Sequence, residues 1–267
     1  MTLQAEDQRD LCQAVQLLEY PGFAARLADQ LGMPLERLLR KLPTEANEAV
    51  EELTRRAIRR ALDTALSTLE AGQSPGSADR AHKALAGVSG AVGGLFGAPG
   101  LAVELPVTTV LILRSIADIA RSQGEDISAL PGQLACLEVF ALGGRSRRDE
   151  GTETGYYAVR ATLAATLADA ARHLARAGVL ERGGPILARL VAKLSSRFGV
   201  AASQKLAAQA IPAIGALGGA GINLLFINHF QAMARGHFIV RRLERQYGQE
   251  VIRAEYARLR AQPYYHP

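Results

Sequence analysis

Residues 206–234 read LAAQAIPAIGALGGAGINLLFINHFQAMA and contain no Lys, Arg, Asp or Glu. A second stretch, ALAGVSGAVGGLFGAPGLAVELPVTTVLIL at residues 84–113, has one formal charge, on Glu104. The rest of the chain is polar enough to surround these two stretches. Each is also longer than the roughly 20 residues that span a hydrocarbon core. We therefore expect them to form either a buried helical core or hairpins that enter a bilayer, with the buried core favoured because prolines and glycines interrupt both.

Both stretches carry three glycines spaced three residues apart, which are Gly94, Gly97 and Gly100 in the first and Gly215, Gly218 and Gly221 in the second. This spacing removes side chains from one face of a helix and lets another backbone approach closely. We therefore predict that these are helix-packing positions. When the sequence is aligned with itself so that Gly94 matches Gly215, Arg114 also matches Arg235. This match is consistent with an internal pseudo-repeat, and the glycine triplets by themselves are also consistent with the glycine-rich composition.

Composition predicts an all-α fold. Hydrophobic residues make up 48% of the chain, but aromatic residues only 5%, and Trp is absent. A core of Ala, Leu, Val and Ile suits close helix packing. Alternating β-branched runs bounded by turn signals are missing from the sequence. We therefore predict a multi-helix bundle that contains two Gly-rich apolar helical hairpins.

Periodicity and breakers place the helices and a possible domain boundary. A Gly/Ser/Pro-rich linker at residues 72–77 divides an N-terminal helical region, 1–76, from a core, 77–267, although one domain of 1–267 remains the alternative. Pro99 and Pro212 are expected to break helices, and Pro106 to lie in the first turn of one. The predicted helices cover residues 1–20, 23–31, 34–41, 45–71, 85–97, 107–122, 132–142, 156–177, 185–198 and 226–247, followed by a short one in the tail.

Charge and cysteine content narrow the choice of partners. The net charge is +5, and the basic residues are scattered without interleaved aromatics, so we expect no nucleic-acid binding. Cys12 and Cys136 are far apart and lack metal-ligand spacing, which favours a reducing compartment and, for Cys136, a buried apolar position. Acidic residues near the start do not match a signal peptide. We expect a cytoplasmic protein that can attach peripherally to the inner membrane.

Several isolated polar groups are candidates for an interior site. Glu104 needs a partner in its apolar surroundings, and Arg114 or Arg235 is the natural choice from the sequence. A structural ion pair is the preferred interpretation, and a carboxylate tuned by burial is the alternative. The remaining candidates for a polar network or a ligand site are Asp118, Glu138, Arg160, Lys205, Asn223, His229 and His237.

Catalytic and metal motifs are missing from the sequence. His229 and His237 are eight residues apart and cannot chelate one ion from a single straight helix, so we predict no metal site and no cofactor. No Walker lysine pattern or Gly-x-Ser-x-Gly occurs either. If the protein is an enzyme, Glu104, His229 and His237 are the acid–base candidates, and they must then converge on one accessible cavity.

Short motifs are spread along most of the chain: ELPVTT (104–109), LRSIADIA (113–120), CLEVFALGG (136–144), GYYAVR (155–160), Lys205 with Ala208 and Gln209, PAIGA (212–216), Asn223 and HFQAMARGHF (229–238). Together they resemble the EcsC protein family over about residues 20–255. The resemblance implies a bacterial protein, because the family is named after one encoded beside the two components of an ABC transporter. It also implies a link to a transporter or membrane, and it brings no established activity, cofactor or catalytic residue.

Two function classes follow. The first is an accessory protein without catalysis, attached to a membrane surface or an ABC transporter complex, in which Arg241, Arg242 and Arg245 contact acidic headgroups. The second is an enzyme or binding module that takes a lipid-like or other apolar ligand in a cavity containing Glu104, His229 and His237. A bound lipid without turnover would favour the binding module.

Overall fold

The computed structural model describes residues 3–19, 22–31, 44–70, 98–144, 155–177, 184–209 and 212–261. All regular elements within these ranges are α-helices, so the predicted all-α fold is confirmed. Their bounds are α1 Ala5–Glu19, α2 Phe23–Leu31, α4 Thr44–Glu70, α6 Ala98–Ser122, α7 Leu130–Leu142, α8 Tyr156–Ala177, α9 Pro185–Gln209, α10 Pro212–Tyr247 and α11 Gln249–Arg260.

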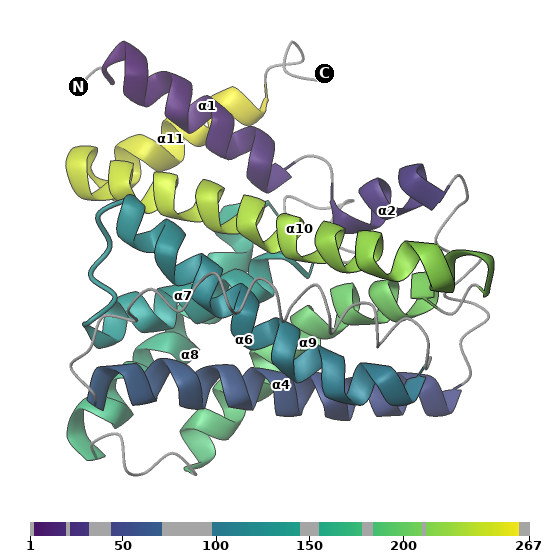
Figure 1. Cartoon of the computed structure of the whole chain (residues 1–267). Helices are drawn as coiled ribbons and strands as arrows, with labels where there is room; N and C mark the ends of the chain where they lie inside the picture. Colours follow the sequence, from purple (N-terminus) through teal and green to yellow (C-terminus); the bar gives the residue numbers. More distant parts are fainter. Residues whose placement is uncertain are drawn as a thin grey trace.

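The bundle is layered around α7. In Figure 1, α10 and α4 lie on opposite sides, with α6, α7 and α9 between them, while α1 and α11 cover the outer side of α10. Helix α7 is apolar apart from Gln133 and Glu138, and it is buried from Gly132 to Leu142. A helix that is hydrophobic all round belongs in the centre of a bundle, and α7 contacts α4, α6, α8, α9 and α10.

Apolar side chains from all described helices form one core. Its centre is a group of phenylalanines that pack largely edge to face, with Phe140 of α7 and Phe226 of α10 both against Phe198 of α9. The core includes residues on both sides of the predicted domain boundary, such as Leu11 and Ile112. The linker at 72–77 lies outside the described residues.

One proline prediction needs correction, because Pro106 lies inside α6 rather than in the first turn of a helix. Pro99 lies in the first turn of α6, and the helix expected at 85–97, which it was predicted to end, lies outside the described residues. An interior proline costs one backbone hydrogen bond, about 3 kcal/mol. Burial of Leu105 and Ile112 on the same helix offsets that cost. Pro212 begins α10, which therefore starts well before the predicted residue 226, and α9 continues past the predicted end at 198.

The glycine triplets can be assessed only in part. Gly94 and Gly97 lie outside the described residues, and Gly100, Gly215 and Gly218 are helical positions whose packing is not described. Gly221 is half-buried in α10. The helix-packing role therefore stays a prediction.

A close approach of helices does occur at glycines that the sequence pattern did not single out. A Cβ at Gly236 of α10 would lie 2.6 Å from Leu18 Cγ of α1. At Gly144 it would lie 1.8 Å from the backbone oxygen of Arg197 in α9. A side chain at Gly236 would push α1 and α10 apart, and one at Gly144 would push the segment that follows α7 away from α9.

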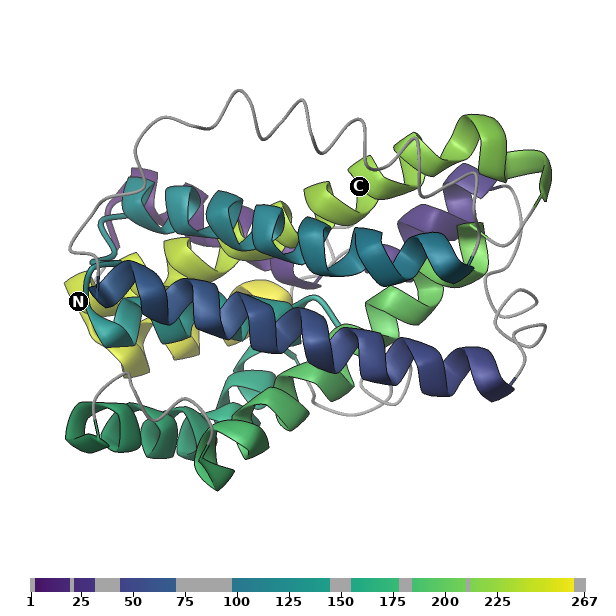
Figure 2. The ribbon, with the colours of Figure 1, turned by 60° about the horizontal axis from the view of Figure 1, so that its bottom comes forward.

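Helices α6 and α10 are parallel neighbours, as Figure 2 also shows from another side. Gln231 donates a hydrogen bond to Ser115 Oγ at 2.6 Å, and Arg241 pairs with Glu125 beyond the end of α6 at 2.7 Å. Both contacts advance in the same direction along the two helices, so α6 and α10 run parallel. The repeat itself stays a prediction. Within the described ranges, the helices are too short or too polar to cross a membrane.

Candidate functional site

A buried ion pair joins α6, α9 and α10. Lys205 Nζ of α9 lies 2.7 Å from Glu104 Oε1 and donates a second hydrogen bond to Asn223 Oδ1 at 2.8 Å. The Lys205 and Glu104 side chains are only 0% and 2% exposed. The ammonium group also lies 4.9 Å from the centre of the Phe226 ring, a favourable cation–π distance. Three helices are therefore tied together at one interior point.

The partner of Glu104 differs from the sequence prediction. Arg114 and Arg235 are both exposed, and the charge that neutralises Glu104 comes from Lys205, about a hundred residues away in sequence. Burial lowers the pKa of Lys205, while the charge of Glu104 and its hydrogen bond act in the opposite direction. Gln209 adds a longer contact to Glu104 Oε2 at 3.4 Å. This is the geometry of a closed structural ion pair.

A second polar cluster joins α8 to the middle of α10. Tyr156 Oη lies 2.9 Å from His237 Nδ1 and accepts a hydrogen bond from Arg160 Nη1 at 3.2 Å. Arg160 also pairs with Glu244 at 2.7 Å, and Tyr157 donates to the same carboxylate at 3.0 Å. Burial raises the pKa of Tyr156, so the phenol keeps its proton, and the His237 tautomer decides which of Tyr156 Oη and His237 Nδ1 is the donor in their hydrogen bond.

Glu138 of α7 closes the other side of His237. Its Oε2 lies 3.7 Å from His237 Nε2, beyond hydrogen-bond distance. Burial raises the pKa of Glu138 to about 7, since the nearby charge of Arg160 compensates only partly. Burial also lowers the pKa of His237 well below its ordinary value, with Arg160 and Arg241 adding repulsion. Both groups are therefore biased toward their neutral forms.

His229 lies apart from both clusters. Its Nε2 donates a hydrogen bond to the backbone oxygen of Gly143 at 2.8 Å, and its ring packs against Phe23 and Phe230. Gly143 has no room for a side chain, because a Cβ would lie 2.2 Å from the Phe230 ring. His229 thus fastens the end of α7 to α10.

The sequence comparisons can now be set beside this geometry. The model of the EcsC protein family matches residues 24–243. The chain belongs to the EcsC protein family. No curated protein and no solved structure is similar enough to the chain to count as a match. In this EcsC protein the matched range contains Glu104, Lys205, Asn223, Glu138 and His237, the central residues of both buried clusters.

The three acid–base candidates of this EcsC protein do not share a reacting centre. Glu104 is hydrogen-bonded to α9, His229 to the residue that follows α7, and His237 to α8. Each side chain is nearly fully buried against its own partners. In the described part of the chain, clusters of His, Cys, Asp and Glu suited to a metal ion do not occur. Asp118 is exposed and pairs with Arg121 on the same helix.

The predicted single polar network is therefore two clusters and one separate histidine. Sequence reasoning missed Glu244, whose carboxylate accepts hydrogen bonds from both Arg160 and Tyr157. It lies seven residues after His237, so both face the same side of α10, and this spacing was the available signal. Glu19 was also missed, although it is buried and accepts hydrogen bonds from the Tyr156 backbone and Tyr256 Oη.

The basic group at the end of α10 is tied into ion pairs. Glu125 lies between Arg241 and Arg245. Burial alone would raise the pKa of the Glu125 carboxyl, but the hydrogen bonds and charges of the two arginines outweigh it and lower that pKa. Arg242 pairs with Asp10 of α1. Arg241 and Arg245 share the single carboxylate of Glu125, and the Arg245 side chain is 43% exposed. The contact of these three arginines with acidic headgroups stays a prediction.

Proposed function

We propose that this EcsC-family protein is a non-catalytic accessory protein that attaches peripherally to the inner face of a membrane. The observation that carries this proposal is the closure of the interior. Each buried ionisable candidate has its own structural partners, and they lie in separate places. An interior built in this way stabilises a rigid body, so the protein acts through its surface.

The proposed contact surface lies around Val107 of α6 and Leu224 in the first part of α10, away from the part of α10 that α1 and α11 cover. Among the described residues, Val107 and Leu224 are large hydrophobic side chains with exposed fractions of 39% and 59%. They lie on neighbouring parallel helices, and each helix carries an exposed arginine further along, Arg114 or Arg235. Apolar side chains beside basic ones suit the boundary between acyl chains and acidic headgroups.

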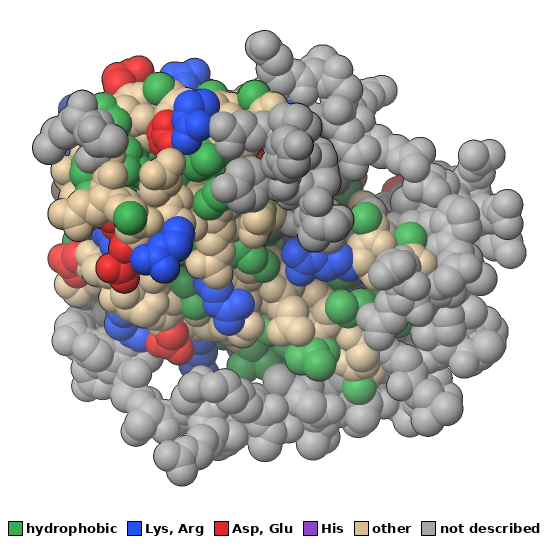
Figure 3. Space-filling model, turned by 90° about the horizontal axis from the view of Figure 1, so that it is seen from above, with side chains coloured by type: hydrophobic (Ala, Val, Ile, Leu, Met, Phe, Trp, Pro, Cys, Tyr) green, Lys and Arg blue, Asp and Glu red, His purple; other side chains and the backbone are tan. Residues whose placement is uncertain are grey.

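Charge alone offers less support for membrane attachment. Figure 3 shows the face above α1 and α11, where the described Lys and Arg side chains are interspersed with Asp and Glu. Such a mixed surface attracts acidic lipids weakly, and salt screens what attraction remains. We therefore assign the main contribution to the apolar side chains and a smaller, salt-sensitive one to Arg114 and Arg235.

Vesicle flotation tests this proposal. The protein should float with phosphatidylglycerol vesicles at low salt, less at high salt, and least with phosphatidylcholine. Substituting Leu224→Ser together with Arg114→Gln and Arg235→Gln should reduce the floating fraction. Replacing Arg172 and Arg176 of α8 by Gln removes two exposed arginines elsewhere and should leave it unchanged. Protein that ignores anionic vesicles would refute the proposal, and retention on a solubilised ABC transporter instead would assign the surface to a protein partner.

A further inference from the structure

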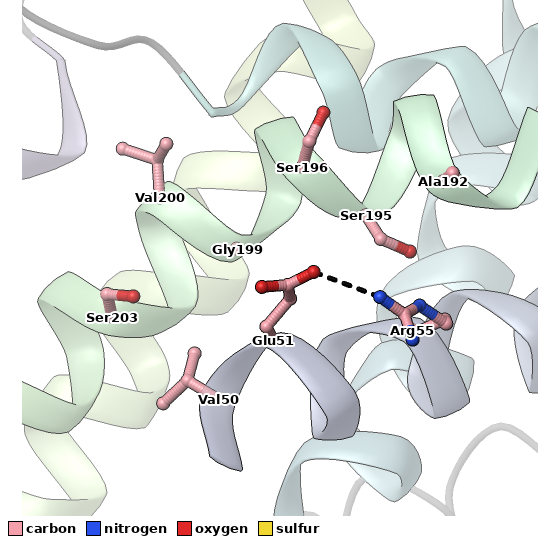
Figure 4. A pocket seen from close by; sticks show the side chains of 9 residues that line it. All are labelled: Val50, Glu51, Arg55, Ala192, Ser195, Ser196, Gly199, Val200 and Ser203. Carbon is pink, nitrogen blue, oxygen red and sulfur yellow. Dashed lines mark hydrogen bonds and ion pairs between the residues drawn. The ribbon is translucent and has the colours of Figure 1, made fainter. Parts of the chain in front are cut away.

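A pocket lies between the start of α4 and the middle of α9. Its volume is about 410 Å³, within the range of small-molecule sites. Figure 4 shows α4 below and α9 above, with Gly199 opening the centre. The lining combines small apolar groups with hydroxyls and one ion pair, and consists of Val50, Glu51, Arg55, Ala192, Ser195, Ser196, Gly199, Val200 and Ser203. None of these residues belongs to the two buried clusters.

The hydroxyl of Ser195 has no hydrogen-bond partner within the described part of the chain, although the residue is only 5% exposed. Helical hydroxyls usually bond to a carbonyl one turn back, as Thr54 does with Val50 and Ser196 with Lys193. Ser195 does not, and in Figure 4 it points toward Arg55 and α4, whereas Ser196 points away. A buried hydroxyl without a hydrogen bond raises the free energy of the folded protein, so a bound molecule that forms this hydrogen bond gains affinity.

The charges beside the pocket cancel. Arg55 is held by Glu51 at 2.9 Å and by Glu52 at 3.3 Å, and Arg56 also pairs with Glu52 at 2.7 Å. Two carboxylates thus face two guanidinium groups, which leaves no excess charge to attract an ion. The ligand that fits is uncharged, with an apolar part for Val50 and a polar end for Ser195.

We propose that this α4–α9 pocket binds a small uncharged amphipathic molecule, a short alkyl chain that ends in a hydroxyl or carbonyl group. Ser195 donates a hydrogen bond to its polar end and can accept one from a hydroxyl. The alkyl part displaces water from the apolar lining between the two helices. The pocket lies on α4 and α9, so the proposal does not depend on membrane attachment through α6 and α10.

The test uses the full chain with labelled valine methyls and 1-hexanol as the probe, followed by NMR. Saturable shifts are expected at Val50 and Val200, with hexanoate, its charged counterpart, binding more weakly. Substituting Ser195→Ala should raise the dissociation constant about 3- to 10-fold, the loss of one hydrogen bond. The matched control Ser196→Ala removes a hydroxyl that is already bonded within α9 and should leave the constant unchanged.

Filling the pocket gives an independent measurement. A Cβ at Gly199 would meet only Thr54, at 3.8 Å, so Gly199→Leu places its side chain in the pocket without a backbone clash. Leu also favours helix over Gly, and circular dichroism will confirm that the variant folds. We expect it to lose the 1-hexanol shifts. Absence of saturable shifts in the wild type, equal effects of Ser195→Ala and Ser196→Ala, tighter binding of hexanoate, or unchanged binding to Gly199→Leu would each overturn the proposal.

Discussion

Substituting Lys205→Met tests whether the buried ion pair stabilises the bundle. Methionine keeps most of the aliphatic length that packs beside Phe226, so the main loss is the ammonium group. Glu104 would remain 2% exposed, with only the 3.4 Å contact to Gln209 in place of the 2.7 Å ion pair. Removing one partner of a buried pair costs about 3–5 kcal/mol, because the other charge stays buried without compensation.

Urea unfolding followed by circular dichroism measures this loss. The control is Arg172→Met, which breaks an exposed ion pair with Asp169 on the same helix and should cost at most about 0.5 kcal/mol. Adding Glu104→Gln to Lys205→Met removes the stranded carboxylate and should recover at least about 2 kcal/mol. If Lys205→Met costs no more than the surface control, or if the double variant recovers nothing, the reasoning is wrong.

Three further predictions concern protonation, close packing and thiol reactivity. Because burial raises the pKa of Glu138 from 4.5 to about 7, its folded form holds a proton that the unfolded chain releases, so stability should fall by up to about 3 kcal/mol as pH rises between these values. The lowered pKa of His237 has the opposite effect on stability, because below pH 6.5 the unfolded chain binds a proton that the folded protein does not. Glu138→Gln leaves only this effect, so urea unfolding of that variant should show stability rising toward pH 6.5 and then levelling. Gly144→Ala should cost about 1–3 kcal/mol by clashing with the α9 backbone, whereas Gly199→Ala, which meets nothing closer than 3.8 Å, should gain about 0.5–1 kcal/mol in the same assay. Burial raises the pKa of the Cys136 thiol to about 12, so iodoacetamide at pH 8 should leave it unmodified in the folded protein, as mass spectrometry can check.

Local sequence signals predicted most helices well. Helix α8 was expected at 156–177 and spans Tyr156–Ala177, because a Gly-containing loop precedes it and its apolar residues recur with helical period. Breaker signals were less reliable. Pro106 and Gly199 lie inside helices because the apolar positions on both sides continue into the core. Tertiary burial outweighed the local cost at both positions.

Pairings between distant residues could not be derived in the same way. Glu104 was assigned to Arg114 or Arg235 because these arginines end the two uncharged stretches, but the helical period turns both outward. The actual partner, Lys205, precedes the second stretch on a different helix. Its burial depends on how α9 crosses α6 and α10, and no spacing within one segment contains that information. The contacts of Glu104 follow from this crossing. An isolated charge in an apolar stretch therefore identified the right residue, but it could not identify its partner.

The contacts of α10 explain how one long helix holds several neighbours in register. Along its length it presents Asn223 to α9, Gln231 to α6 and His237 to α8, each about two turns after the previous one. Polar groups buried at such intervals fix the register of three neighbours, since a slip of any helix would leave a donor or acceptor unpaired. Their contacts lie at separate points along α10, so they tie it to three different neighbours. This arrangement supports our proposals that the exposed sides of α6 and α10 around Val107 and Leu224, and the pocket between α4 and α9, are where the protein meets other molecules.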